Sequence, residues 1–154
     1  MIINIVLAFI LPWIFGLLLY RKDKFIVLLT APIASAVAFL FNELGFSLGY
    51  WLLYPIYDHV SISALPFNLG LYPVVASYFG YLLIRRSMNH LWLILLFPTA
   101  LTAGEAIAHY LSLVMYFNGW NIGWTFVSYF AWIVIIYYYS KKIHPLLETY
   151  RNND

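Results

Sequence analysis

Apolar residues fill five long stretches of the chain, and short polar segments separate them. A helix needs about 20 apolar residues to cross the hydrocarbon layer of a bilayer, because each residue adds about 1.5 Å. Each stretch meets or approaches that length, so the pattern predicts an all-α integral membrane bundle of five helices. We place these helices at residues 2–20, 25–42, 61–84, 91–117 and 124–140.

The composition supports a membrane protein. Hydrophobic residues make up 64% of the 154 residues and charged residues only 9%, whereas a soluble domain carries about 25% charged residues. Since the apolar stretches are spread from end to end, we treat residues 1–154 as a single transmembrane domain. The net charge of +2 gives no indication of nucleic-acid binding, and the absence of cysteine excludes disulfides and thiolate chemistry.

The eight Lys and Arg residues form three clusters. With five crossings, all three clusters fall on one side of the membrane, and the N-terminus falls on the other side. Because basic residues are retained in the cytoplasm, we expect a cell-membrane protein with its N-terminus outside and a cytoplasmic tail at residues 141–154. The clusters are Arg21, Lys22 and Lys24; Arg85 and Arg86; and Lys141, Lys142 and Arg151.

The segment at residues 44–59 is harder to place. It is apolar and aromatic, but glycines and Pro55 interrupt it, and Tyr and Trp favour the membrane–water interface. A single helix over residues 25–57 would be about 50 Å long, which is too long for one simple crossing. We expect an interfacial or re-entrant segment on the outer face. The alternative is a shifted or tilted second helix, which would place Glu43 within the membrane.

Five polar side chains recur at spacings of three and four along the fourth predicted helix. This spacing places them on one face, which must contact another helix or a water-filled cavity because lipid cannot satisfy polar groups. Glu105 and His109 are the most informative pair, because both are ionisable. They could handle a proton, bind an ion or ligate a metal, or they could simply cross-link helices through hydrogen bonds. The five residues are Thr102, Glu105, His109, Ser112 and Tyr116.

The third and fifth predicted helices also carry polar residues toward the outer side. Asn68 lies at a depth similar to that of His109, where its structural role would be an interhelical hydrogen bond worth about 1 kcal/mol. Ser128 lies on a polar stripe of the fifth helix. Polar residues on three helices thus lie toward the outer side, and this predicts an outward-facing cavity. The alternative is packing alone, because helix bundles also bury hydroxyls. The expected ligand-binding residues are Asn68, Thr102, Glu105, His109, Ser112, Tyr116 and Ser128.

Acidic residues and histidines in the outer half raise the question of a metal. Carboxylates and imidazoles suit divalent cations, but the chain lacks a zinc signature and the Glu-x-x-His spacing of di-iron bundles. We therefore expect no metal and no cofactor. Glu43, Asp58 and His59 are the candidates if a metal binds.

Two short stretches carry a resemblance. Residues 105–110 read Glu-Ala-Ile-Ala-His-Tyr, and residues 116–120 read Tyr-Phe-Asn-Gly-Trp. In these stretches the chain resembles small polytopic bacterial membrane proteins of uncharacterised families. The resemblance covers a small part of the chain, and it implies neither an activity nor a role for any residue.

Three functional hypotheses follow. The first is a membrane protein that binds or transports a small or lipidic ligand in a cavity around Glu105 and His109. The second is a structural or accessory subunit without chemistry of its own. The third is a membrane enzyme acting on a lipid or isoprenoid, with Glu105 and His109 as the candidate catalytic residues and Glu105 as the general acid or base. The expected partners are the lipid bilayer and a lipid or small-molecule ligand, and a homo-oligomer or a membrane-protein partner is left open.

Overall fold

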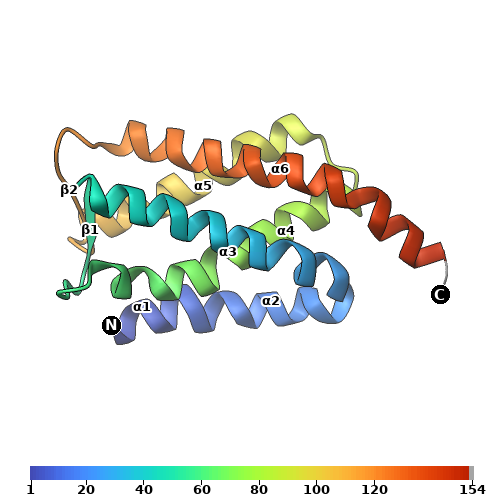
Figure 1. Cartoon of the computed structure of the whole chain (residues 1–154), viewed down its shortest axis with the longest axis horizontal. Helices are drawn as coiled ribbons and strands as arrows, with labels where there is room; N and C mark the ends of the chain where they lie inside the picture. The colour runs from blue at the N-terminus through green and yellow to red at the C-terminus, as the bar shows by residue number, and fades with distance from the viewer. Residues whose placement is uncertain (153–154) are drawn as a thin grey trace.

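The computed structural model describes residues 1–152 and is mostly helical (80%). The helices run side by side in alternating directions (Figure 1). The prediction of a helical bundle is therefore confirmed. Within the described residues, five helices are long and apolar enough to cross a membrane: Ile2–Lys22, Lys24–Ser47, Val60–Ile84, His90–Tyr110 and Ile122–Leu146.

Two of the five crossings are composite helices. The first, called the N-terminal helix below, joins α1 (Ile2–Ile5), the π-helical turn η1 (Val6–Ile10) and α2 (Leu11–Lys22). The third joins the 3₁₀ turn η2 (Val60–Ala64), the π-helical turn η3 (Phe67–Leu71) and α4 (Tyr72–Ile84). The other elements are α3 (Lys24–Ser47), β1 (Trp51–Leu53), α5 (His90–Tyr110), β2 (Val114–Tyr116) and α6 (Ile122–Asn152).

Proline accounts for part of this irregularity. Pro73 has no N–H group, so the carbonyl of Leu69, four residues earlier, loses its helical donor. The indole of Trp13 on α2 donates to that carbonyl at 2.7 Å. A freed carbonyl in a membrane helix needs such a partner because lipid offers none.

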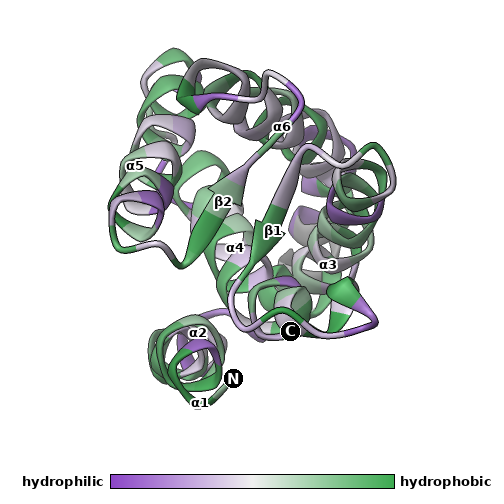
Figure 2. Cartoon of the chain, turned by 90° about the vertical axis from the view of Figure 1, so that its left-hand side faces the viewer, coloured by the Kyte–Doolittle hydropathy of each residue, from purple (hydrophilic) through white to green (hydrophobic). Residues whose placement is uncertain are grey.

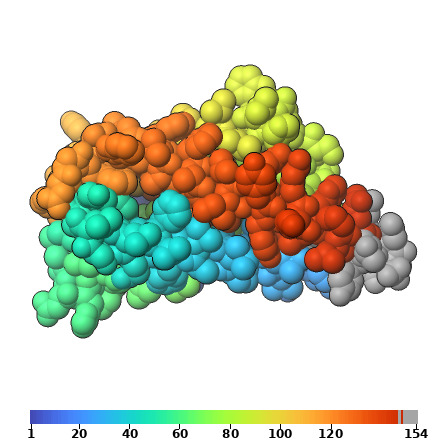
Figure 3. Space-filling model, turned by 45° about the horizontal axis from the view of Figure 1, so that its top comes forward, coloured from blue at the N-terminus to red at the C-terminus, as the bar shows by residue number. Residues whose placement is uncertain are grey.

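Helix α4 occupies the centre of the bundle. It packs against α2, α3, α5 and α6, and the largest buried cluster, which includes Phe79, Leu93 and Ile133, lies between it and α3, α5 and α6. Helices α3 and α6 lie side by side on the surface (Figure 3). The N-terminal helix packs on α3 and α4, whereas α5 packs on α6 and α4. Viewed along the bundle, the N-terminal helix and α5 lie apart (Figure 2).

Two short strands cover the end of the bundle near the N-terminus (Figure 1). Strands β1 and β2 pair antiparallel, with Trp51 opposite Tyr116 and Leu53 opposite Val114. The expectation of a purely helical protein therefore needs correction. The segment between α3 and η2 includes β1 and contains no helix.

Each strand follows a helix that ends in a Schellman motif. After α3, the N–H of Tyr50 donates to the carbonyl of Gly45 at 2.9 Å; after α5, the N–H of Leu113 donates to the carbonyl of Ala108 at 2.8 Å. Such a motif needs one residue with positive φ. Gly49 supplies it after α3, and Ser112, with φ of 59°, supplies it after α5.

These motifs correct two predicted helix boundaries. The fourth helix ends at Tyr110 rather than at residue 117, because the chain reverses at Ser112. The second helix continues beyond residue 42 to Ser47, so Glu43 is helical and exposed.

The fifth helix is also longer than predicted. It begins at Ile122 and continues through Pro145 to Asn152, so most of the predicted polar tail is helical. The last two residues of that tail, 153–154, lie outside the described residues.

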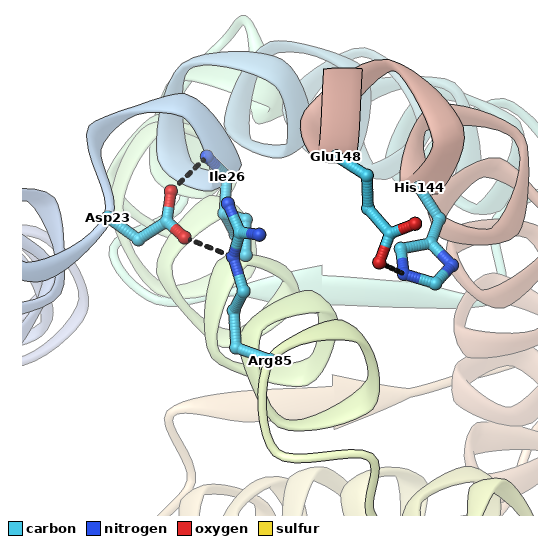
Figure 4. A network of polar contacts seen from close by, with 5 residues as sticks. All are labelled: Asp23, Ile26, Arg85, His144 and Glu148. Carbon is cyan, nitrogen blue, oxygen red and sulfur yellow. Dashed lines mark hydrogen bonds and ion pairs between the residues drawn. The ribbon is translucent and has the colours of Figure 1, made fainter. Parts of the chain in front are cut away.

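The basic clusters lie at the end of the bundle opposite the strands (Figure 1). We call the two ends the basic end and the strand end. At the basic end Asp23 accepts a hydrogen bond from the backbone N–H of Ile26 at 3.1 Å, which caps α3. The same carboxylate pairs with the Arg85 guanidinium at 2.6 Å (Figure 4). This pair ties the α2–α3 connection to the end of α4.

Candidate functional site

A cavity of about 410 Å³ lies at the strand end of the bundle. All five crossings and both strands contribute to its wall. The strands cover its end through Trp51, Leu53 and Val114. Most of its surface is apolar, and the polar groups that line it include the carboxylate of Glu105 and the side chains of Asn42 and Ser128.

Glu105 on α5 is held by three hydroxyl groups from neighbouring elements. Tyr116 on β2 donates to Oε1 at 2.6 Å, and Tyr129 on α6 donates to Oε2 at 2.5 Å. The hydroxyl of Thr125 lies 3.2 Å from Oε1. Thr125 and Tyr129 are one turn apart on α6, so both reach the same carboxylate. Tyr116 reaches it because the Schellman motif after α5 folds β2 back over the helix end.

The hydroxyl groups extend into a longer network. Trp120 donates to the Thr125 hydroxyl at 3.0 Å, and that hydroxyl lies 3.0 Å from the Tyr116 oxygen. On the other side, the hydroxyls of Tyr72 and Tyr129 are 3.2 Å apart. Burial and the nearby Glu105 carboxylate raise the pKa of Tyr116, so its phenol stays protonated at neutral pH and keeps its role as a donor.

No cation accompanies the Glu105 carboxylate in the part of the chain that the structure describes. The ion pairs there are Asp23–Arg85 and His144–Glu148, both toward the basic end (Figure 4). Uncharged donors alone stabilise Glu105. A carboxylate offers about four lone-pair sites. Among the described residues Oε2 accepts only from Tyr129, so it retains capacity for a further donor.

A second group of polar side chains surrounds the cavity on the side of α3. Asn42 donates to the side-chain oxygen of Asn68 at 2.7 Å and accepts from the indole of Trp51 at 3.4 Å. Asn4 on α1 donates to the carbonyl oxygens of Tyr54 and Ser63 at 2.8 and 3.3 Å. These bonds use both amide hydrogens of Asn4 and one of the two of Asn42, and they fix the N-terminal helix, α3 and the strand segment against one another.

The structure brings some of the predicted site residues together. Glu105 and Ser128 line the cavity, and Tyr116 binds the Glu105 carboxylate. Asn68 bonds to Asn42 but does not itself line the cavity; it is only 1% exposed, and its Nδ2 group has no hydrogen-bond partner among the described residues. Its contact with Asn42 is the interhelical hydrogen bond that its position suggested.

The structure places the remaining members of the predicted polar stripe outside the cavity. Thr102 is half-buried, and within residues 1–152 its hydroxyl has no hydrogen-bond partner. His109 is exposed, its Nδ1 lies 2.9 Å from the carbonyl oxygen of Val114, and its ring stacks on Tyr116 at 4.4 Å between centroids. Ser112 is exposed in the turn. The predicted five-residue helical stripe is wrong beyond Tyr110, because Ser112 and Tyr116 follow the end of α5.

Several residues of the site were absent from the predicted set. Thr125 lies three residues before Ser128 on the same polar stripe of the fifth helix, and Tyr129 stands one turn beyond Thr125, so the spacing alone could have indicated this pair. The aromatic residues gave no such signal, because side chains that face lipid have the same composition. The residues concerned are Asn42, Trp51, Tyr72, Trp120, Thr125, Tyr129 and Trp132.

The metal candidates do not form a cluster. Glu43, Asp58 and His59 are exposed, and no three His, Asp or Glu side chains gather as a metal-binding group within residues 1–152 that the structure describes. Within the same residues no hydrogen bond joins Glu105 to His109. His109 instead holds the backbone of β2.

The exposure of the lining residues shows where the cavity opens. On the N-terminal helix Ile3 and Leu7 are 44% and 53% exposed, and Gly104 on α5 is also exposed. On the opposite wall Thr125 and Trp132 are 1% and 2% exposed. The cavity therefore opens sideways, between the N-terminal helix and α5, rather than through the strands.

Comparison with known proteins adds no assignment. The chain matches no protein-family model, no curated protein and no solved structure, so the functional argument rests on the geometry of the cavity.

Proposed function

We propose that this protein binds a lipidic or other small apolar ligand in the cavity around Glu105, within the cell membrane. The observation that carries the proposal is a cavity of about 410 Å³ whose carboxylate has no cationic partner among the described residues. An ionisable group within a membrane bundle is costly to maintain and commonly serves a function. A purely structural glutamate needs no cavity beside it.

The position of the opening supports a ligand that comes from the bilayer. Leu7 and Gly104 stand on either side of the opening, and the flanking surface is apolar. A hydrocarbon chain can pass between the N-terminal helix and α5 without losing its apolar surroundings, whereas a strongly hydrated solute would have to shed its water.

The proposal includes an orientation. The basic end faces the cytoplasm, since Lys and Arg are retained on that side. The strand end and the cavity then lie in the outer half of the membrane, with the N-terminus outside. In this orientation the ligand is drawn from the outer leaflet.

Occupancy of the cavity can be tested with a larger side chain at its opening. A Cβ added at Gly104 meets no atom within 4 Å, so Gly104→Leu extends into open space. Ala103→Leu is the matched control, because the neighbouring Ala103 is exposed on the same helix but does not line the cavity. Native mass spectrometry after mild extraction measures bound small molecules.

We expect the wild type and Ala103→Leu to retain a bound amphiphile and Gly104→Leu to lose it. Equal retention by both variants would show that the molecule binds elsewhere. A wild-type protein without any bound molecule, and without affinity for added amphiphiles, would contradict the proposal and favour a role for the Glu105 network in helix packing alone.

A further inference from the structure

The cavity combines an uncompensated carboxylate with a wall rich in aromatic rings. Glu105 receives hydroxyl donors only, and Oε2 retains a free lone pair among the described contacts. When it is ionised, this carboxylate favours a cation with an N–H donor, because opposite charges attract one another more strongly in apolar surroundings than in water.

The aromatic rings supply a second feature that selects cations. The ring faces of aromatic residues attract a positive charge within about 6 Å. Trp51 and Trp120 stand 4.7 Å apart at the strand end, and Tyr72 stands 5.6 Å from Trp132 on the opposite side. The lining rings are Phe41, Trp51, Phe67, Tyr72, Trp120, Tyr129 and Trp132.

The cavity offers no positive charge to an anionic head group. None of the described residues that line it is Lys or Arg. Asn4 donates both amide hydrogens to Tyr54 and Ser63, and Asn42 donates one to Asn68. A head group that carries only negative charge, such as the carboxylate of a fatty acid, would lie next to Glu105 without a counter-ion, and this repulsion disfavours it.

We propose that the ligand is a lipophilic primary or secondary amine, bound as its ammonium ion with Glu105 as the counter-ion. This inference rests on the proposed function and specifies its ligand class. The ammonium group donates to Oε2 of Glu105 among the aromatic rings. The apolar chain leaves between Leu7 and Gly104 toward the bilayer.

The test compares head groups on one chain length. Dodecylamine, dodecanol and dodecanoate are titrated into nanodiscs that hold the wild-type protein, with quenching of tryptophan fluorescence as the readout and empty nanodiscs as the correction for partitioning. At pH 7 the amine is charged, since an alkylammonium group has a pKa near 10. We expect the amine to bind at least ~10-fold more tightly than the alcohol, and the dodecanoate to bind most weakly.

Glu105→Gln keeps the shape of the side chain and removes its charge. We expect this variant to lose the ~10-fold preference for the amine while its affinity for dodecanol stays the same. Ala103→Leu is the control that should behave as the wild type. Butylamine, which is soluble in water, tests the source of the ligand. Weak binding of butylamine supports an amphiphile that comes from the bilayer. Binding as tight as that of dodecylamine would show that the long alkyl chain plays no part in recognition.

The outcomes separate this inference from the proposed function. If dodecanol binds as tightly as dodecylamine and Gly104→Leu weakens both, the cavity binds amphiphiles but the ammonium inference is wrong. If none of the three compounds binds, the proposed function fails as well. The comparison of head groups on the wild-type protein decides the inference even if Glu105→Gln does not fold.

Discussion

Gly45 lies against the indole of Trp51, the ring that covers the strand end of the cavity. A Cβ built on Gly45 would collide with three atoms of that ring. The ring cannot move freely, because its N–H bonds to Asn42 at 3.4 Å and its centroid lies 4.7 Å from that of the Trp120 ring. We therefore expect Gly45→Ala to displace Trp51 and to open the end of the cavity.

The size of the effect follows from two opposing terms. Replacing glycine by alanine inside a helix favours folding by about 0.5–1 kcal/mol, and overpacking a tight contact costs about 1–3 kcal/mol. Gly104→Ala is the matched control, because it lies within helix α5 and its added Cβ meets no atom within 4 Å. The difference in free energy of unfolding between the two variants should be about 1–3 kcal/mol.

Equilibrium unfolding in mixed micelles measures that difference, and tryptophan fluorescence reports the displacement of the indole. Gly104→Ala should be slightly stabilised with an unchanged emission spectrum, whereas Gly45→Ala should be less stable with an altered spectrum. Equal stabilisation of both variants with unchanged emission would refute the placement of Trp51 on Gly45, and with it the described end of the cavity.

Three further predictions concern the frame of the site. Ser112→Gly should stabilise the protein by about 1 kcal/mol, because Ser112 has a φ of 59° that glycine adopts without strain; thermal unfolding measures it, and no gain would contradict the Schellman motif. Asp23→Ala should lower the free energy of unfolding by about 1 kcal/mol more than Asp23→Asn does, because asparagine keeps the helix cap and loses only the charge of the pair with Arg85. Equal losses of stability in the two variants would rule out the cap. A double-mutant cycle on Asn42 and Asn68 should give a coupling of about 1 kcal/mol, and additive effects would show that the two side chains do not bond.

The membrane bundle could be predicted from the sequence because its signal is strong. Twenty-residue apolar segments and the clustering of basic residues depend on the bilayer rather than on any tertiary contact. The basic clusters at 21–24, 85–86 and 141–142 lie at one end of the bundle, as the five-span topology requires (Figure 1).

The turns after α3 and α5 were harder to predict. Gly49 is an ordinary signal for a helix end, but Ser112 in a left-handed conformation is not, because serine seldom adopts positive φ. The polar spacing of three and four continued past that turn by coincidence and favoured a longer helix. Tyr116 reaches Glu105 by folding back through β2, not by following it along a helix.

The site was found only in part for a related reason. Glu105 and Ser128 stood out because a polar residue is rare in an apolar helix. The aromatic wall could not be recognised, since Trp and Tyr are equally common on surfaces that face lipid and on surfaces that line a cavity. Which aromatic residues turn inward depends on the packing of α3, α4 and α6 around one another.

The central claim is that an amphiphile enters between the N-terminal helix and α5 and ends at Glu105. Photo-crosslinking with a diazirine-bearing alkyl chain, followed by peptide mapping, measures this position directly. We predict labelling of the residues around Leu7 and Gly104, weaker labelling of the lipid-facing Leu95 and Leu96 on α5, and loss of the first signal in Gly104→Leu. Labelling spread evenly over α5, and unchanged in that variant, would contradict the claim.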